Sequence, residues 1–424
     1  MCLHALAASA ELVLMDELTG LLKTHPQIQA AEKSRAAQNK AVDRAESKFW
    51  PTVSATGDAG PEYVSNPTTR TDAQLDREWR RTRNVAGVTV SKNLFDGGVV
   101  ASAVKSARLN HEVADLTLEA TRQATLFEGT NAYINVLRQR RLIQLSRQAE
   151  DNVQKQLQLE DERVQRGSGV AVDVLEAKRR LQTAKERRVT YEGALADAVS
   201  KYNQIFAHSP DVEAMVDPTP PIELLPSDLD KAIEIALREN PAVDNAAVAV
   251  EVAREAREVV DAQYLPTIDL VGKANYEKHK NATLGTRRDY FVGVQATWDM
   301  FTGFSTQHAA SQAAFSYGAS KDTALHMGRK VTEQTRLAWQ ALLTARERVQ
   351  LLENAVNIAH EVWISRQKLR ESGKETVINV LDAENEVSNA QINYTAAAYD
   401  ERVAVFQVLL AMGRLSPRFL GIVE

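Results

Sequence analysis

The chain has 424 residues, a quarter of them charged, and a formal net charge of only −5. A nearly balanced, mildly acidic chain gives no reason to expect nucleic acid or an anionic membrane surface as a partner. The single cysteine is Cys2, which excludes an internal disulfide framework and a metal site built from several cysteines.

Residues 1–10 are small and apolar and end in Ala8-Ser9-Ala10, which resembles the end of a signal peptide with an A-x-A cleavage site. An ordinary frayed N-terminus would have the same composition. Cys2 is also a candidate for lipid attachment, although only Met1 precedes it. These alternatives stay open. No stretch of the sequence has the eighteen or more apolar residues that a membrane-spanning helix needs.

Residues 11–208 form the first of two predicted repeats. A helix over about 14–48 stops at a proline and is followed by two strands. A long helix without proline comes next, and at about 1.5 Å per residue it extends on the order of 100 Å. The turn Gly167-Ser168-Gly169 then leads into a return helix. The predicted ranges after the first helix are strands 52–64 and 83–94, long helix 98–165 and return helix 172–206.

Residues 209–226 contain Pro218, Pro220 and Pro221, and this composition indicates a linker or a small segment that lies along the surface. The second repeat, residues 227–413, has the same order of elements, with Ser372-Gly373-Lys374 as its turn. Residues 414–424 are a C-terminal tail. The predicted ranges of the second repeat are helix 227–263, strands 267–277 and 289–299, long helix 304–371 and return helix 377–412.

Matching residues at fixed displacements show that the chain is duplicated. Two pairs are displaced by 215 residues and several by 206, so one change of nine residues separates the copies. That change falls between Pro51 and Phe95, inside the first strand pair. A repeated unit of this kind predicts two copies of one substructure. The pairs include Asn240-Pro241 with His25-Pro26, Tyr264-Leu265-Pro266 with Phe49-Trp50-Pro51, Phe301-x-Gly303 with Phe95-x-Gly97, and Val380-Leu381-Asp382-Ala383 with Val174-Leu175-Glu176-Ala177.

Apolar and polar residues alternate along the predicted strands, most clearly in the second repeat, where Ile268, Leu270 and Gly272 share one face. Each alternating run has about ten residues, the length of a tilted membrane strand. Three aromatic residues near strand ends on the apolar face are typical of a membrane aromatic belt: Tyr276, Tyr290 and Trp298. A soluble sheet with one buried face is the alternative. Because four strands cannot enclose a lumen, a membrane barrel would have to be shared between chains.

Motifs for catalysis, metal binding and cofactors are missing from the sequence. The eight histidines never have the i, i+4 spacing of a zinc-binding helix, and there is no G-x-S-x-G elbow or P-loop. We therefore expect no enzyme activity, no metal and no cofactor.

The chain resembles the TolC-type outer-membrane efflux protein family over nearly its whole length. The matching features, in order, are the proline-terminated entry helices, the strand exits and the hairpin tips. They comprise Asn240-Pro241 with Tyr264-Leu265-Pro266, Leu94-Phe95-Asp96-Gly97-Gly98 and Trp298-Asp299-Met300-Phe301-Thr302-Gly303, then Arg166-Gly167-Ser168-Gly169 to Asp173-Val174-Leu175 and Ser372-Gly373 to Asn379-Val380-Leu381-Asp382-Ala383.

This resemblance implies an α+β membrane protein that acts as a homotrimer. Long antiparallel coiled-coil hairpins would form a trimeric α-barrel, and four strands per chain would contribute to a shared twelve-strand transmembrane β-barrel. The protein would lie in the outer-membrane lipid of a bacterial cell and extend into the periplasm, where it meets a periplasmic adaptor and an inner-membrane transporter.

The implied function is a passive exit duct of a tripartite efflux pump or a type I protein secretion system; the cargo is left open. The alternative is a soluble periplasmic coiled-coil adaptor or scaffold. An adaptor, however, would need one hairpin flanked by compact β-domains.

The resemblance also implies site residues. Asp382 and Asn379 match the periplasmic gate, although Asn379 departs from the family's usual acid. The alternative for Asp382 is a solvated surface charge. The family's inter-helix latch near this tip is altered, since Arg370 and Glu375 occupy that neighbourhood, and no gating salt bridge is assigned. The hairpin tips match adaptor-docking surfaces, although Asp173 and Gly373 also have structural explanations, as a helix-start carboxylate and a turn glycine. The docking residues are Arg166, Gly167, Asp173, Val174, Leu175, Gly373, Val380 and Leu381.

Overall fold

The computed structural model describes residues 14–71, 79–167 and 170–418. The predictions for residues 1–10 and for Ser168 and Gly169 lie outside these ranges. The chain forms two compact units. The first, which we call the helical unit, consists of Met1–Lys33, Leu116–Asn245 and Leu325–Glu424. The second, the sheet unit, consists of Ser34–Asp115 and Ala246–Ala324.

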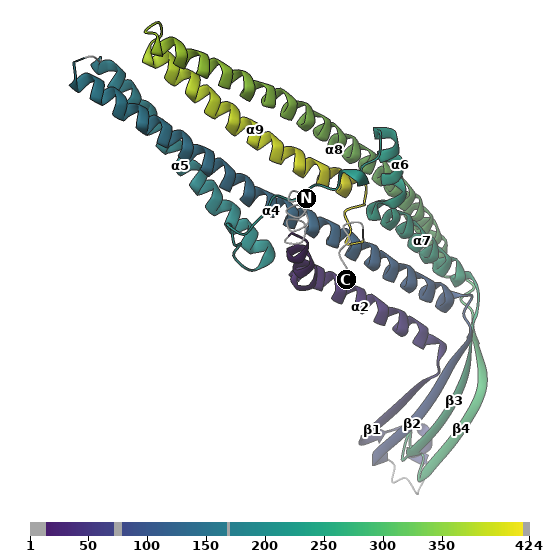
Figure 1. Cartoon of the computed structure of the whole chain (residues 1–424). Coiled ribbons are helices and arrows are strands. Elements are labelled where there is room, and N and C mark those ends of the chain that lie inside the picture. The colour runs from purple at the N-terminus through teal and green to yellow at the C-terminus, as the bar shows by residue number, and fades with distance from the viewer. Residues whose placement is uncertain (1–13, 72–78, 168–169, 419–424) are drawn as a thin grey trace. The chain divides into compact units, whose positions relative to one another are not determined.

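Four long helices dominate the fold: α4 (Val99–Gln165), α5 (Ala171–Phe206), α8 (Ser305–Glu371) and α9 (Val377–Ala411). Figure 1 shows that α4 runs against α5 and α8 against α9, so each copy of the repeat gives one antiparallel hairpin. Helices this long bury a narrow apolar stripe along their neighbours. The largest fully buried side chains in the helical unit include Leu126, Tyr133, Leu137, Tyr202, Leu342, Leu409 and Met412.

The single helices predicted over about 14–48 and 227–263 are wrong in one respect, since each is two helices. Residues 14–24 are followed by α2 (Pro26–Glu46), and α6 (Leu229–Glu239) is followed by α7 (Pro241–Asp261). Proline has no N–H to donate, and it disfavours helical backbone in the residue before it. The side chain of Asn240 then accepts from the N–H of Ala242 at 2.9 Å and starts α7. The short helices η1 (Ser47–Phe49) and η4 (Ala262–Tyr264) follow α2 and α7.

The segment 209–226, predicted as a linker or a small surface segment, packs against α4. Met215 is buried, and its carbonyl accepts from Arg140 at 3.1 Å. The buried hydroxyl of Tyr133 donates to the carbonyl of Val216 at 3.1 Å. One short helix, η3 (Ile222–Leu224), lies within the segment. These contacts hold the segment to the side of the helical unit.

The sheet unit contains one antiparallel sheet in the order β1 (Thr52–Val64), β2 (Trp79–Phe95), β3 (Thr267–Lys278) and β4 (Thr286–Thr297). The pairing of β2 with β3 joins the two copies of the repeat. The loop between β1 and β2 contains α3 (Pro67–Thr71). In contrast to the predicted bounds, β2 starts before residue 83, and β4 is 286–297 rather than 289–299. The added residues are mostly charged or polar, so no apolar alternation marked them as strand.

Both copies turn from strand to helix at a glycine in the left-handed region. Gly97 has φ +69° and Gly303 has φ +64°, a conformation that other residues adopt at a cost. The carboxylate of Asp96 then accepts from the N–H groups of Gly98 and Val100, both at 2.9 Å, and caps α4. In the second copy the hydroxyl of Thr302 accepts from the N–H of Thr306 at 3.3 Å.

Candidate functional site

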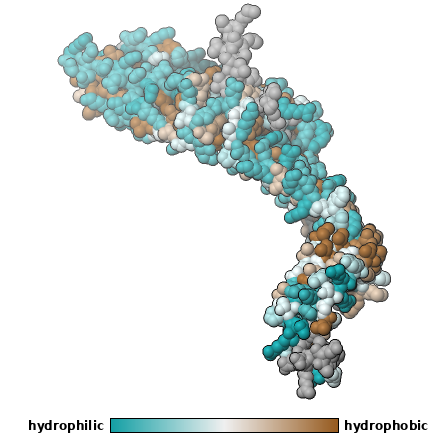
Figure 2. All heavy atoms as spheres, turned by 90° about the horizontal axis from the view of Figure 1, so that it is seen from below, coloured by the Kyte–Doolittle hydropathy of each residue, from teal (hydrophilic) through white to brown (hydrophobic). Residues whose placement is uncertain are grey.

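One face of the sheet is apolar and exposed. Val53, Val90, Gly272 and Val292 are cross-strand partners and form one row across the four strands. The exposed fraction is 68% for Val53 and 81% for Val292. Figure 2 shows hydrophobic side chains gathered over the sheet, whereas the helices are mainly hydrophilic. Exposed apolar surface of this extent indicates contact with lipid or with another chain.

The three predicted belt aromatics lie on this apolar face or just past its end. Tyr276 and Tyr290 are in β3 and β4, and both are exposed. Trp298 follows β4, and its indole N–H donates to the carbonyl of Tyr264 at 3.1 Å. The sequence interpretation did not assign to the belt the further exposed aromatics at the strand–helix junctions, although their positions near Pro51 and Gly303 could have indicated them: Trp50, Phe301 and Phe304.

Two kinds of feature are not found in the part of the chain that the structure describes. None of its helices is long and apolar enough to cross a membrane. Within the same residues, no group of three or more His, Cys, Asp or Glu side chains is arranged to hold a metal ion.

The first hairpin tip turns at Gly167, which has φ +75°. Arg166 is exposed and pairs with Glu162 at 3.1 Å on its own helix. Asp173 lies in the first turn of α5, where a carboxylate faces the positive end of the helix dipole. Leu175 is 65% exposed, but Val174 is buried. The tip therefore presents only some of the predicted docking residues.

The second tip is held by side-chain hydrogen bonds at the start of α9. Gly373 has φ +73°, and the hydroxyl of Thr376 accepts from the N–H of Asn379 at 3.4 Å. The side-chain amide of Asn379 donates to Glu375, and this bond lowers the pKa of that carboxyl group. Val380 and Leu381 are buried. In this structure neither of these apolar side chains can reach a partner from outside the hairpin.

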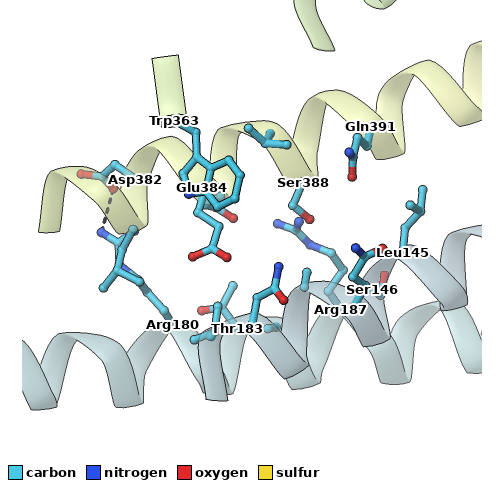
Figure 3. A pocket seen from close by; sticks show the side chains of 18 of the residues that line it. Leu145, Ser146, Arg180, Thr183, Arg187, Trp363, Asp382, Glu384, Ser388 and Gln391 are labelled. Atoms are coloured by element: carbon cyan, nitrogen blue, oxygen red, sulfur yellow. Dashed lines mark hydrogen bonds and ion pairs between the residues drawn. The ribbon is translucent and has the colours of Figure 1, made fainter. Parts of the chain in front are cut away.

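The predicted gate residue Asp382 has a partner from the other copy. Arg180 of α5 donates to its carboxylate at 2.7 Å, as the dashed line in Figure 3 shows. Arg180 also donates to Glu176 of its own helix at 3.0 Å. Arg179 donates to the same carboxylate at 2.9 Å, and chiefly this bond lowers the pKa of Glu176 to about 2. Two carboxylates and two guanidinium groups thus form one cluster whose charges cancel.

A second ion pair joins the two hairpins near their tips. Arg370 of α8 pairs with Glu160 of α4, whose side chain is only 2% exposed. Gln156 and Arg163 also donate to Glu160, at 3.0 and 3.3 Å. The sequence interpretation placed Arg370 in this neighbourhood but missed Glu160. No spacing rule connects residues on separate helices, and Glu160 looks like any other acid on a long charged helix.

The contacts between the return helices α5 and α9 join residues whose numbers differ by a constant amount. Arg180 contacts Asp382, and one heptad later Arg187 contacts Asn389 at 2.6 Å. Both pairs are 202 residues apart, whereas equivalent positions of the two copies are 206 apart. The copies are therefore shifted by four residues, about one helical turn, where they meet. A cavity of about 420 Å³ lies beside these contacts, between the two hairpins.

Comparisons with known proteins agree with this architecture. The model of the outer membrane efflux protein family matches residues 18–205 and 232–414. The outer membrane efflux protein BepC of Brucella suis is 24% identical over 419 residues, covering 98% of this chain and 89% of its own. The outer membrane protein TolC of Vibrio cholerae is 25% identical over 397 residues, covering 92% and 88%. The structure of the Campylobacter jejuni CmeC outer membrane channel superposes with a TM-score of 0.82 at 13% identity, covering 95% and 86%.

Proposed function

The chain belongs to the outer membrane efflux protein family, and on that premise we propose that it assembles as a homotrimer with a gated periplasmic end. The predicted family resemblance, fold class and outer-membrane location are confirmed, as is the function of an exit duct of the efflux or type I secretion kind. The family consists of channel proteins, and we extend this to the proposal that the chain itself performs no catalysis. In this proposal the chain provides a passage for the cargo and does not change it chemically.

The exposed apolar sheet face is the observation that supports the assembly. β1 and β4 are the edge strands of the sheet, and unpaired edges favour pairing with another chain. Three chains would contribute twelve strands to one shared transmembrane β-barrel, a number taken from the family. The row that contains Val53 and Val292 would then face lipid, so that apolar surface meets acyl chains instead of water.

The aromatic belt has a spacing that suits a bilayer. Tyr276 pairs with Arg288, ten residues before Trp298. At about 3.3 Å per residue, ten residues extend roughly 33 Å along a strand. A tilt of about 40° reduces this to about 25 Å along the membrane normal, the height of the apolar band of outer-membrane barrels. Tyr276 and Trp298 would thus lie near opposite interfaces.

A pair of variants tests the orientation of the sheet. Val292→Arg places a charge in the middle of the apolar face, which costs about 2–4 kcal/mol on the lipid side of a membrane strand. Gln295→Arg adds the same charge to the same strand on its opposite face. We expect only Val292→Arg to reduce the amount of heat-resistant trimer extracted from outer membranes with detergent. Equal yields of the two variants would contradict a lipid-facing row, and recovery of the unmodified protein as a detergent-free monomer would contradict the membrane assignment.

We propose that Asp382 and Asn379 line the periplasmic constriction, as the family resemblance implies. Three copies of Asp382 around an axis would attract cations. The bond from Arg180 offsets part of that charge, and Asn379 adds none. Asp382→Ala should therefore lessen the block of single-channel current by a trivalent cation, while an unchanged block would mean that this carboxylate does not face the pore.

For docking to a periplasmic adaptor and its inner-membrane transporter, we propose the part of the predicted tip set that is not buried: Arg166, Gly167, Asp173, Leu175 and Gly373. Leu175→Glu should reduce cross-linking to the adaptor because it places a charge on an exposed apolar contact. Val189→Glu, at a similarly exposed apolar position of the same helix farther from the tip, is the control. Equal loss from both variants would argue against docking at the tip.

A further inference from the structure

The cavity between the hairpins has the size of a small-molecule site. Its volume of about 420 Å³ lies within the range of ligand pockets in proteins. Both hairpins contribute to its walls, α4 and α5 from the first copy and α8 and α9 from the second. The apolar part of the lining includes Leu145, Val153, Trp363, Leu381 and Val387.

Three polar atoms of the lining have no hydrogen-bond partner among the described residues. They are Oγ of Ser146, Oγ of Ser388 and Nε1 of Trp363. Ser146 is 1% exposed, so its hydroxyl is not open to bulk solvent. Buried polar atoms are normally paired, and each unpaired one is destabilising. Three such atoms in one cavity of the helical unit therefore indicate a place for a ligand with hydrogen-bonding groups.

Two of the three arginines around the cavity are paired with carboxylates, and the third is not. Arg179 and Arg180 are balanced by Glu176 and Asp382 in the cluster described above. Arg187 donates to the neutral side chain of Asn389, and no carboxylate among the described residues forms an ion pair with it. The remaining acid that lines the cavity is Glu384, and burial raises the pKa of its carboxyl group.

Figure 3 shows Glu384 and Ser388 of α9 and Arg187 of α5 pointing into the space between the two hairpins. Three donor types, a guanidinium, an indole N–H and hydroxyl groups, thus meet beside an aromatic and aliphatic wall. A guanidinium that forms no ion pair favours an anion, and the wall favours an apolar or aromatic body.

We propose that this cavity binds a small organic carboxylate with an aromatic or apolar body, its carboxylate on Arg187 and its body against Trp363. The serine hydroxyls of Ser146 and Ser388 would supply further hydrogen bonds. Such a ligand would touch both copies of the repeat.

Binding of an anion should be linked to the protonation of Glu384. The charged or titratable groups that line the cavity around it are Arg179, Arg180 and Arg187 of α5, His360 of α8 and Asp382 of α9, while α4 contributes the neutral Asn152. An ionised Glu384 would repel a carboxylate, and a protonated one would donate to it. Affinity for the ligand should therefore fall as the pH rises through the pKa of Glu384. Glu384→Gln isolates the contribution of Glu384 to this pH dependence.

The test uses the full-length, detergent-solubilised protein and calorimetric titration with 4-iodobenzoate. The neutral 4-iodobenzyl alcohol and the cationic 4-iodobenzylamine have nearly the same shape. We expect the carboxylate to bind at least tenfold more tightly than either analogue, because a charged hydrogen bond to Arg187 is lost with both. Anomalous diffraction from iodine in a soaked crystal should place the ring beside Trp363.

Arg187→Gln should weaken 4-iodobenzoate binding about tenfold or more, whereas Arg141→Gln removes an exposed arginine outside the cavity and should change nothing. Glu384→Gln should retain binding and flatten its pH dependence. The proposal is overturned if the carboxylate does not bind, if it binds no better than the alcohol, or if iodine lies elsewhere. If Arg187→Gln disturbs assembly, the pH dependence of binding to the unmodified protein decides. Above about pH 5, where the carboxyl group of 4-iodobenzoate is ionised, an affinity that rises with pH contradicts the proposal.

Discussion

The ion pair between Arg370 and Glu160 allows a quantitative prediction for the hairpin tips. Its carboxylate is 2% exposed and the side chain of Arg370 14%, so water screens this pair little. Replacing Arg370 by Gln leaves a buried carboxylate without its main partner, which typically costs 3–5 kcal/mol. Gln156 and Arg163 still donate to Glu160. We therefore expect the lower end, about 3 kcal/mol.

Amide hydrogen exchange is the suitable assay, because the cost concerns local opening of the tips and not unfolding of the whole protein. A loss of about 3 kcal/mol corresponds to roughly 100-fold faster exchange through local opening. We expect this acceleration in the last turns of α4 and α8 in the Arg370→Gln variant. The double variant Glu160→Gln/Arg370→Gln should exchange close to the unmodified rate, since no buried charge remains in it.

Arg166→Gln is the matched control. It removes an arginine from the same tip, but its partner Glu162 is 59% exposed, and such surface pairs contribute about 0–1 kcal/mol. If Arg370→Gln accelerated exchange no more than Arg166→Gln, the burial argument would be wrong. A double variant as unstable as Arg370→Gln alone would show that lost packing, and not an unpaired charge, is responsible.

Two further predictions concern other parts of the chain. Gly97→Ala should reduce the yield of assembled trimer more than Gly303→Ala. Both glycines have positive φ, but only at Gly97 would an added Cβ lie close to another residue, 3.0 Å from the carbonyl oxygen of Ala262. A comparison of the trimer yields of the two variants checks this. Glu239 accepts two hydrogen bonds from Arg414, which lower its pKa to about 2, so this pair stabilises above the ordinary pKa of 4.5 and its contribution disappears as the pH falls towards 2. Glu239→Gln should thus lower the free energy of unfolding by about 2 kcal/mol at pH 7 and by little near pH 2, measured by urea titration in detergent.

Periodicity and repetition were enough to predict the long helices, the strand pairs and the duplication, because each depends on residues close in sequence. The environment of the tips was not predictable in this way. Leu175 and Leu381 are equivalent residues of the two copies, yet one is 65% exposed and the other 2%. Their difference depends on how α5 and α9 meet, with an offset of four residues that neither copy contains by itself. The burial of Val174 and Val380 narrows the proposed docking surface for the same reason.

At the proposed gate, the four-residue offset between α5 and α9 determines which charged side chains meet. Glu176 and Asp382 are equivalent carboxylates of the two copies, and both accept hydrogen bonds from the one residue Arg180. The second copy has Glu386 where the first has Arg180, so Asp382 depends on the first copy for its counter-charge.

Removing either partner of the contact between Arg180 and Asp382 should change the cation block of the channel, in opposite directions for the two partners. Asp382→Ala leaves the cluster with one excess positive charge per chain, whereas Arg180→Gln leaves one excess negative charge, or three in the proposed trimer. If the cluster faces the pore, a trivalent cation should block Arg180→Gln channels more strongly than the unmodified protein and Asp382→Ala channels more weakly, because the local potential changes sign between them. Single-channel recordings at several salt concentrations would measure the difference in block between the two variants. This difference must shrink as added salt screens the charges. A block that changes in the same direction in both variants would mean that the contact between α5 and α9 acts on the width of the opening and not on its charge.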